Sequence, residues 1–156
     1  MKITTRELRH SDKEPFLQVA QTFFNESYHK NDSIRLDKFW KLLSNTLKHS
    51  NVSIPCAFVD GEIVGYAIIN YNTEFKDERE GELSKFYIMP QYRASGVSRH
   101  LAQVVVNVFD EWGCADSHLW AAPQLEGSDH NINLFKNLWT RYGYKETGVI
   151  MTRKKD

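Results

Sequence analysis

A short segment of the chain joins a predicted strand to a predicted helix and has the features of a phosphate-binding loop. An extended run over 82–89 ends at Pro90, and a helical pattern begins directly after residues 93–98. The first backbone N–H groups of a helix lack partners within it, and the positive end of the helix dipole lies behind them. Such groups bind phosphate or pyrophosphate readily. Since many strand-loop-helix turns bind no ligand, the loop alone leaves both interpretations open.

Several other chemistries are not supported by the residue spacing. An ATPase phosphate loop needs Gly, four residues and then Gly-Lys-Ser/Thr, and a dinucleotide fingerprint needs three glycines in six positions, whereas residues 93–98 contain only Gly96. No Gly-x-Ser-x-Gly sequence occurs, which argues against a serine hydrolase. The six histidines form no pair at i, i+4 and have no cysteine at zinc spacing, so we expect no metal site.

The elements that must position this loop are predicted from hydrophobic periodicity. Apolar residues that recur every three or four positions indicate four helices, each with one face for packing. A capping box over 11–14 precedes the first helix, and Gly113 ends the third. The predicted helices lie near residues 11–24, 36–49, 98–112 and 131–142.

Extended segments predict six strands around these helices. Two of them form a hairpin through Asp60-Gly61, and its second arm is apolar on both faces, which is typical of a central strand. Pro55 predicts that the first arm either has an irregularity or has a side where no backbone N–H is needed for pairing. The predicted strands cover residues 1–8, 52–60, 62–71, 82–89, 118–122 and 145–153.

Length and composition favour one domain over residues 1–156. The chain is 41% hydrophobic, and 20 basic residues balance 20 acidic ones. This balance gives no strong nucleic-acid signal. No apolar run approaches the ~18 residues of a membrane span, so we expect no membrane partner and a cytoplasmic protein. Cys56 and Cys114 lie far apart in sequence and are expected to be reduced thiols.

The loop Arg93-Ala94-Ser95-Gly96-Val97-Ser98, after a strand and a proline, resembles the acetyl-CoA pyrophosphate loop of the GNAT superfamily of N-acetyltransferases. Residues 133–144, which begin near an Asn and close at Gly-aromatic, are similar to a second motif of that family, and residues 56–68 to its second and third strands. The resemblance spans about residues 1–152. It implies a single α/β (α+β) domain with a mixed central sheet of about six to seven strands, flanked by about four helices.

The activity implied by the resemblance is transfer of an acetyl group from acetyl-CoA, a cosubstrate, to a primary amine of a small molecule or a protein, by direct attack in a ternary complex. An amine of pKa ~10.4 must lose a proton first, at a cost of roughly 4.6 kcal/mol at pH 7. The family position of a base falls on Glu82, which could equally be a solvated carboxylate. The acidic run 74–80 could attract a cationic acceptor or could simply be a solvated loop.

The resemblance also implies which residues hold acetyl-CoA. A backbone N–H of Tyr87, Ile88 or Met89 would bind the thioester oxygen. Asn133 would bond the pantetheine arm, or would simply cap a helix. Ser98 departs from the family's Gly or Ala, and we expect weaker binding at most. The pyrophosphate would be bound by N–H groups of Arg93, Ala94, Ser95, Gly96, Val97 and Ser98, with the Arg93 side chain available for charge pairing.

The chain departs from the family at the residue that often protonates the leaving CoA thiolate. Trp139 stands where many members have Tyr, and an indole N–H is no general acid. Tyr142 lies three residues later and could substitute, or could be a core aromatic. The alternative function is therefore a catalytically weak or inactive GNAT-like domain that binds acetyl-CoA or another protein. The resemblance also leaves a homodimer open.

Overall fold

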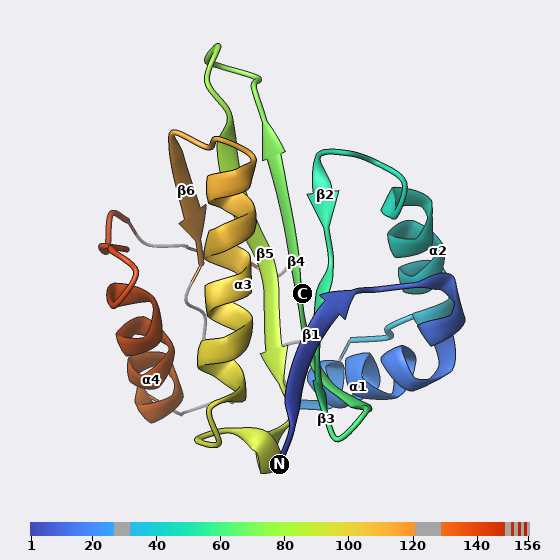
Figure 1. Ribbon diagram of the computed structural model, residues 1–156. Coiled ribbons are helices and arrows are strands. Elements are labelled where there is room, and N and C mark those ends of the chain that lie inside the picture. Colours follow the sequence, from blue (N-terminus) through green and yellow to red (C-terminus); the bar gives the residue numbers. More distant parts are fainter. Residues whose placement is uncertain (27–31, 121–128, 149–150, 152, 154, 156) are drawn as a thin grey trace.

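Within the described residues, six strands form one sheet in the order β1-β3-β4-β5-β6, and β2 pairs with β4 in line with β3 (Figure 1). The computed structural model describes residues 1–26, 32–120, 129–148, 151, 153 and 155. All pairs of these strands are antiparallel except β5 and β6, so the sheet is mixed, as the resemblance implied. The elements are β1 (Ile3–Glu7), α1 (Lys13–Glu26), α2 (Leu36–Thr46), β2 (Val52–Ser53), β3 (Pro55–Val59), β4 (Glu62–Asn72), β5 (Glu80–Ile88), α3 (Val97–Glu111), β6 (Asp116–Leu119) and α4 (Asp129–Thr140).

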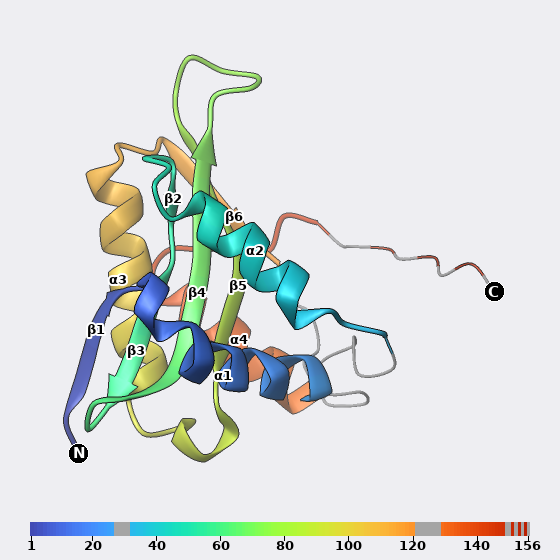
Figure 2. The same ribbon diagram turned by 90° about the vertical axis from the view of Figure 1, so that its right-hand side faces the viewer.

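Helices cover both faces of the sheet, α1 and α2 on one side and α3 and α4 on the other (Figures 1 and 2). Each face has its own buried cluster. On the α1 side, the ring centroids of Phe16 and Tyr66 lie 4.9 Å apart. On the α3 side, Leu101 and Val105 pack against strand residues such as Ile69. The amphipathic spacing thus correctly predicted which helix residues face the sheet.

The hairpin between β3 and β4 forms at the predicted turn. Asp60 and Gly61 both have positive φ, 50° and 88°, as a two-residue hairpin turn of this hand requires. β4 lies between β3 and β5, which explains its apolar character on both faces. An irregularity occurs beside Pro55, because strand conformation is interrupted at Ile54 between β2 and β3. The register with β4 is the same for both strands and shifts only between Ala57 and Phe58.

The start of α1 differs from the expected capping box over 11–14. The capping box lies two residues earlier, over Arg9–Asp12, where the Asp12 carboxylate accepts the Arg9 N–H at 2.8 Å. Arg6 on β1 donates to both carboxylate oxygens, at 2.7 and 3.0 Å. The Arg6 side chain belongs to a strand, and a local sequence pattern does not contain this contact.

We expect Asp12→Asn to lower the free energy of unfolding by about 2 kcal/mol, because hydrogen bonds to charged groups contribute on that order. The hydrogen bond from Arg6 is the main cause that lowers the pKa of Asp12 below its usual value. The stabilisation is therefore present above the usual carboxyl pKa and lost as the pH falls through the lowered value. Urea unfolding of both proteins between pH 2 and 7 measures this, and equal acid sensitivity would contradict the assignment.

The last predicted strand, residues 145–153, is not seen in the part of this segment that the structure describes. Residues 145–148, 151 and 153 have no strand conformation, and 149, 150 and 152 lie outside the described residues. Residues 121 and 122, at the end of another predicted strand, also lie outside them. α2 ends at Thr46 rather than at His49, since the chain turns there toward β2.

Cys56 and Cys114 are both free thiols, as the sequence predicted. Burial raises the pKa of the Cys56 thiol, which leaves it protonated and unreactive. No helix among the described residues has the length and apolar composition needed to cross a membrane.

Candidate functional site

A β-bulge in β5 marks the place where the residues of the candidate site come together. Leu83 pairs with Ile69 of β4 and Lys85 with the adjacent Ile68, so Ser84 is an extra residue between the two pairs. The Ser84 hydroxyl donates to the Ile68 carbonyl at 3.1 Å. A bulge bends its strand. The parallel pairing of β5 with β6 extends only from Glu80 to Leu83, and therefore stops at this bulge.

Beyond the bulge, β5 has an edge that no described strand pairs. The Met89 N–H is engaged, since it donates to the Val64 carbonyl at 2.9 Å. In antiparallel pairing, N–H groups alternate between the two sides of a strand. The N–H of Tyr87 therefore also points toward β4, whereas that of Ile88 points toward the open edge. Of the three donors that the sequence offered for a thioester oxygen, only Ile88 is on this edge.

The loop 93–98 leads into α3 with its backbone donors uncapped. Gly96 is the N-cap residue with φ 92°, and no side chain caps the helix. Ala94 also has positive φ, 62°, and the Ser95 hydroxyl donates to the Tyr92 carbonyl. The His100 N–H makes the first helical bond, to Gly96 O at 3.1 Å. The N–H groups of Val97 and Ser98 precede that bond, so this helix end fits a phosphate group.

The Arg93 side chain, which the resemblance suggested for charge pairing with the pyrophosphate, is engaged by groups of the protein. Its Nη1 lies 2.5 Å from Glu26 Oε1 at the end of α1, and its Nε donates to the Ile88 carbonyl at 2.9 Å. The guanidinium also lies over the Tyr87 ring, with Cζ 5.5 Å from the centroid. Arg93 thus connects the end of α1, β5 and the loop that precedes α3.

Glu82 lies beside a histidine that sequence reasoning missed. His118 of β6 is the register partner of Glu82, and its Nε2 is 4.0 Å from Glu82 Oε2. The Nδ1 of the same ring is 3.4 Å from Glu80 Oε1. The two carboxylates and the imidazole are all partly exposed, on the sheet face opposite α3. Only the parallel pairing of β5 and β6 brings them together, and the sequence contains no signal for it.

The bulge also places Lys85 on the same face of the sheet as Glu82. Residues three apart in a regular strand point to opposite faces, and the extra Ser84 removes that alternation. Lys85 is partly buried, with Nζ 5.9 Å from the centroid of the Phe23 ring. Burial lowers its pKa from the ordinary lysine value.

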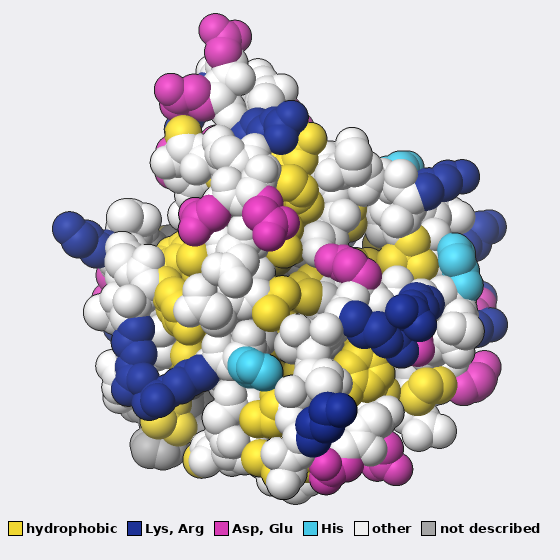
Figure 3. Space-filling view, in the orientation of Figure 1, with side chains coloured by type: hydrophobic (Ala, Val, Ile, Leu, Met, Phe, Trp, Pro, Cys, Tyr) yellow, Lys and Arg dark blue, Asp and Glu magenta, His cyan; other side chains and the backbone are white. Residues whose placement is uncertain are grey.

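The remaining acidic side chains of the run 74–80 lie on the exposed tip of the β4–β5 hairpin (Figure 3). Figures 1 and 2 show this hairpin projecting beyond the sheet. Lys76 there forms an ion pair with Asp116 at 2.7 Å. Within the described residues, no group of His, Cys, Asp and Glu side chains is arranged to hold a metal ion.

The end of α4 places the other predicted residues. Trp139 is 1% exposed and packs against Phe86 at 5.2 Å between ring centroids. α4 ends at Thr140, so Tyr142 lies in the following turn and not on the helix, and its hydroxyl donates to the Arg99 carbonyl at 3.4 Å. Asn133 is exposed and is the fifth residue of α4, so it does not begin the helix as predicted.

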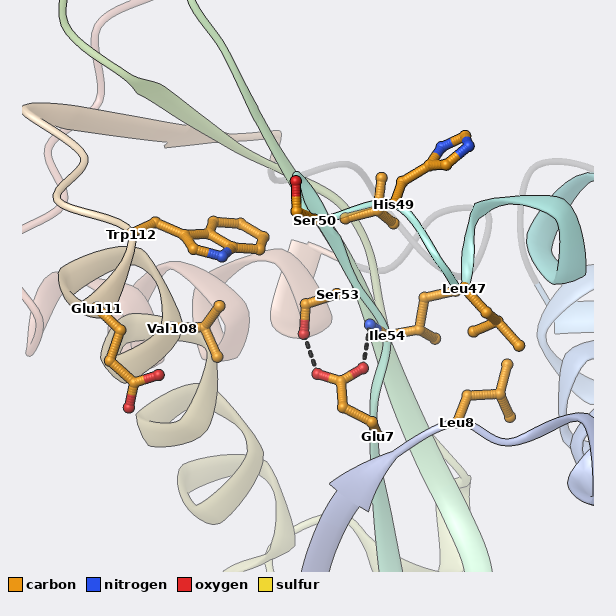
Figure 4. Close-up of a pocket in the computed structure, with 11 residues that line it drawn as sticks. Glu7, Leu8, Leu47, His49, Ser50, Ser53, Ile54, Val108, Glu111 and Trp112 are labelled. Carbon is orange, nitrogen blue, oxygen red and sulfur yellow. Dashed lines mark hydrogen bonds between the residues drawn. The ribbon is translucent and has the colours of Figure 1, made fainter.

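A cavity of about 330 Å³ lies apart from these residues, beside the ends of β1 and α3 (Figure 4). Its lining includes Leu8, Leu47 and Trp112. The Glu7 carboxylate accepts hydrogen bonds from the Ser53 hydroxyl and, at 2.8 Å, from the Ile54 N–H. Glu7 thus bridges β1 to the break between β2 and β3, and the cavity contains none of the residues predicted from sequence.

Solved structures with this fold cover nearly the whole chain. Aminoglycoside N-acetyltransferase AAC(6')-Iy, in complex with the bisubstrate analog CoA-S-monomethyl-acetylneamine, aligns with a TM-score of 0.76 and 15% identity over 100% of this chain and 99% of its own. An aminoglycoside acetyltransferase from an uncultured soil metagenomic sample, in complex with trehalose, aligns with a TM-score of 0.75 and 16% identity over 99% and 97%. At such identities the likeness shows the fold.

Sequence comparisons identify the family. Uncharacterized N-acetyltransferases of Mycobacterium tuberculosis and Mycobacterium bovis are 39% identical over 90 residues, which is 58% of this chain and 51% of each relative. The matched segment thus spans about half the length of these relatives. The family model described as acetyltransferase (GNAT) family matches residues 9–138. This match covers most of the chain, which therefore belongs to the GNAT acetyltransferase family.

Proposed function

We propose that the protein is an N-acetyltransferase that transfers an acetyl group from acetyl-CoA to a primary amine, by direct attack in a ternary complex. The observation that carries this proposal is the end of the β5–β6 pairing at the Ser84 bulge, together with the uncapped start of α3 that follows β5 along the chain. This arrangement leaves backbone N–H donors for acetyl-CoA at the end of β5 and the start of α3. The Glu82 carboxylate is left available for the amine. Acetyl transfer needs both, a site for a charged donor and a base for the amine.

On the donor side, the N–H groups of residues 93–98 hold the pyrophosphate of acetyl-CoA. The helix dipole and the uncapped first turn of α3 favour an anion there. The Ile88 N–H on the open edge donates to the thioester oxygen, where negative charge develops as the amine adds. Asn133, exposed on α4, remains available for the pantetheine arm. The residues present therefore fit acetyl-CoA.

On the acceptor side, Glu82 accepts a proton from the amine, directly or through a water molecule. The neighbouring Glu80 and Glu82 carboxylates attract an ammonium group before it is deprotonated. His118 lies between them and is suited to carry a proton away. Similar structures are named aminoglycoside acetyltransferases, and polyamine sugars carry the charge that these carboxylates favour. We propose a cationic small-molecule amine as the acceptor.

Tyr142 is the proposed acid for the leaving thiolate. The Trp139 indole cannot take this role, because it is buried and its N–H is no general acid. A thiol of pKa ~8.5 leaves readily, so the acid contributes little. We expect Tyr142→Phe to lower kcat by about three- to tenfold, which is less than the roughly hundredfold typical of a general acid, because this leaving group needs little assistance. Steady-state kinetics at saturating substrates measures this. Turnover equal to that of the unchanged protein would exclude Tyr142 as the acid.

Binding and turnover should be measured together. Acetyl-CoA at 100 times its dissociation constant stabilises a fold by about 2.7 kcal/mol. We expect this to raise the melting temperature by several degrees. CoA should give a similar shift, and ATP should give none. Acetylation of a panel of cationic amines should then be detectable by thiol release. A shift without turnover would favour the alternative of an acetyl-CoA-binding module, and no shift would contradict the proposal.

A further inference from the structure

The carboxylate of Glu26, the last residue of α1, contacts both β5 and the first residue of the loop 93–98. Its Oε1 lies 2.5 Å from Arg93 Nη1, and its Oε2 accepts a hydrogen bond from the Tyr87 hydroxyl at 2.6 Å. The Glu26 side chain is 12% exposed. Burial, and then the Glu26 hydrogen bond, raise the pKa of Tyr87, so its phenol stays protonated and donates. Glu26 therefore has two fixed partners.

Arg93 links Glu26 to the end of β5 and to the loop 93–98. Its Nε donates to the Ile88 carbonyl, and Ile88 carries the N–H that faces the open edge. Its own backbone N–H donates to the Pro90 carbonyl at 3.2 Å. A guanidinium holds such a geometry through its rigid fork. Fixing the Arg93 side chain thus fixes the position of the Ile88 N–H on β5 relative to the N–H groups of the loop 93–98.

The backbone that follows Arg93 needs this support. Ala94 has φ 62°, and a residue with a Cβ atom in the left-handed region is strained by about 1 kcal/mol. Such conformations persist only where the surroundings hold them. The side chains that flank Ala94, those of Arg93 and Ser95, both bond to backbone carbonyls of the preceding turn or strand. We read these contacts as what keeps the loop donors preorganised.

We propose that Glu26 is a positioning residue for acetyl-CoA: it holds Arg93 away from the phosphates and thereby fixes the loop whose N–H groups bind them. The inference rests on the proposed function. Because Glu26 belongs to α1, which packs on the sheet face opposite α3, it makes acetyl-CoA affinity depend on a helix from the other face of the sheet. A preorganised loop binds more tightly because less ordering is needed on binding.

The test is a double-mutant cycle read out as the dissociation constant for acetyl-CoA, measured by calorimetry well below the melting temperature. We expect Glu26→Gln to weaken binding about tenfold, as loss of preorganisation does. If Glu26 acts through Arg93, the variant with both Glu26→Gln and Arg93→Gln should bind no more weakly than Arg93→Gln alone. The KM for acetyl-CoA should rise in step, whereas kcat at saturating substrates should stay within about twofold.

Asp12→Asn is the matched control. Asp12 also pairs with an arginine, at 2.7 Å, and its side chain is likewise 12% exposed, but it lies at the opposite end of α1. Asp12→Asn should lower the melting temperature by about as much as Glu26→Gln does, and should leave the affinity for acetyl-CoA unchanged. Should Glu26→Gln prove unfolded, Tyr87→Phe removes one Glu26 partner and should weaken binding about threefold.

Two outcomes would overturn the inference. Glu26→Gln that binds acetyl-CoA as well as the unchanged protein, or more tightly because Arg93 turns to the phosphates, would show that the ion pair does not position the loop. Additive losses in the double variant would show that Glu26 does not act through Arg93. Failure of the unchanged protein itself to bind acetyl-CoA would instead contradict the proposed function.

Discussion

Glu82→Gln is expected to lower kcat by about a thousandfold at pH 7, within the range for loss of a general base. The amide keeps the size of the side chain but accepts no proton, and deprotonating an amine of pKa ~10.4 in solution costs roughly 4.6 kcal/mol at that pH. The measurement is steady-state acetylation of a cationic amine. The KM for acetyl-CoA should change little, because Glu82 lies on the acceptor side of β5.

The pH dependence separates a base from a residue that only binds the amine. The deficit of Glu82→Gln should shrink as the pH approaches the amine pKa, since the amine then arrives as the free base. Glu78→Gln, at an exposed position of the same hairpin, is the control and should keep full activity. A deficit that stays constant up to pH 10, or turnover within twofold of the unchanged protein at pH 7, would exclude Glu82 as the base.

Ser98→Leu is expected to weaken acetyl-CoA binding by more than about a hundredfold. Ser98 is the second residue of α3, beside the uncapped N–H groups, and a leucine there would occupy the space of the pyrophosphate. Losing two hydrogen bonds to a charged group, each contributing about 1.5 kcal/mol or more, accounts for this factor. The dissociation constants of acetyl-CoA and CoA should rise together.

Ser98→Ala provides the comparison for that experiment. The smaller side chain leaves the backbone donors accessible, so affinity should stay within a few-fold. Circular dichroism melts without ligand must show that both variants fold. If Ser98→Leu binds acetyl-CoA normally, the pyrophosphate does not lie at the start of α3, and the proposed donor site is in the wrong place.

Residues close in sequence determined much of this protein. The periodic apolar positions of α1, α2 and α3 predicted helices and their buried faces, because a helix repeats every 3.6 residues whatever it packs against. Asp60-Gly61 predicted its hairpin, since such a turn depends on backbone angles within a few residues. The order of strand, loop and helix was therefore predictable, and with it the family.

Tertiary structure decided how the side chains of the site are arranged. The Ser84 bulge depends on how β5 pairs with β4, and one extra residue reverses which face each following side chain occupies. Glu26 and Arg93, or Glu82 and His118, are far apart along the chain and meet only through packing and strand register. The sequence by itself thus determined the elements and the loop that offers backbone donors. Only the folded sheet decided that Arg93 binds Glu26, that Ile88 faces the open edge and that His118 joins the carboxylates, because such contacts depend on distances that no local pattern encodes.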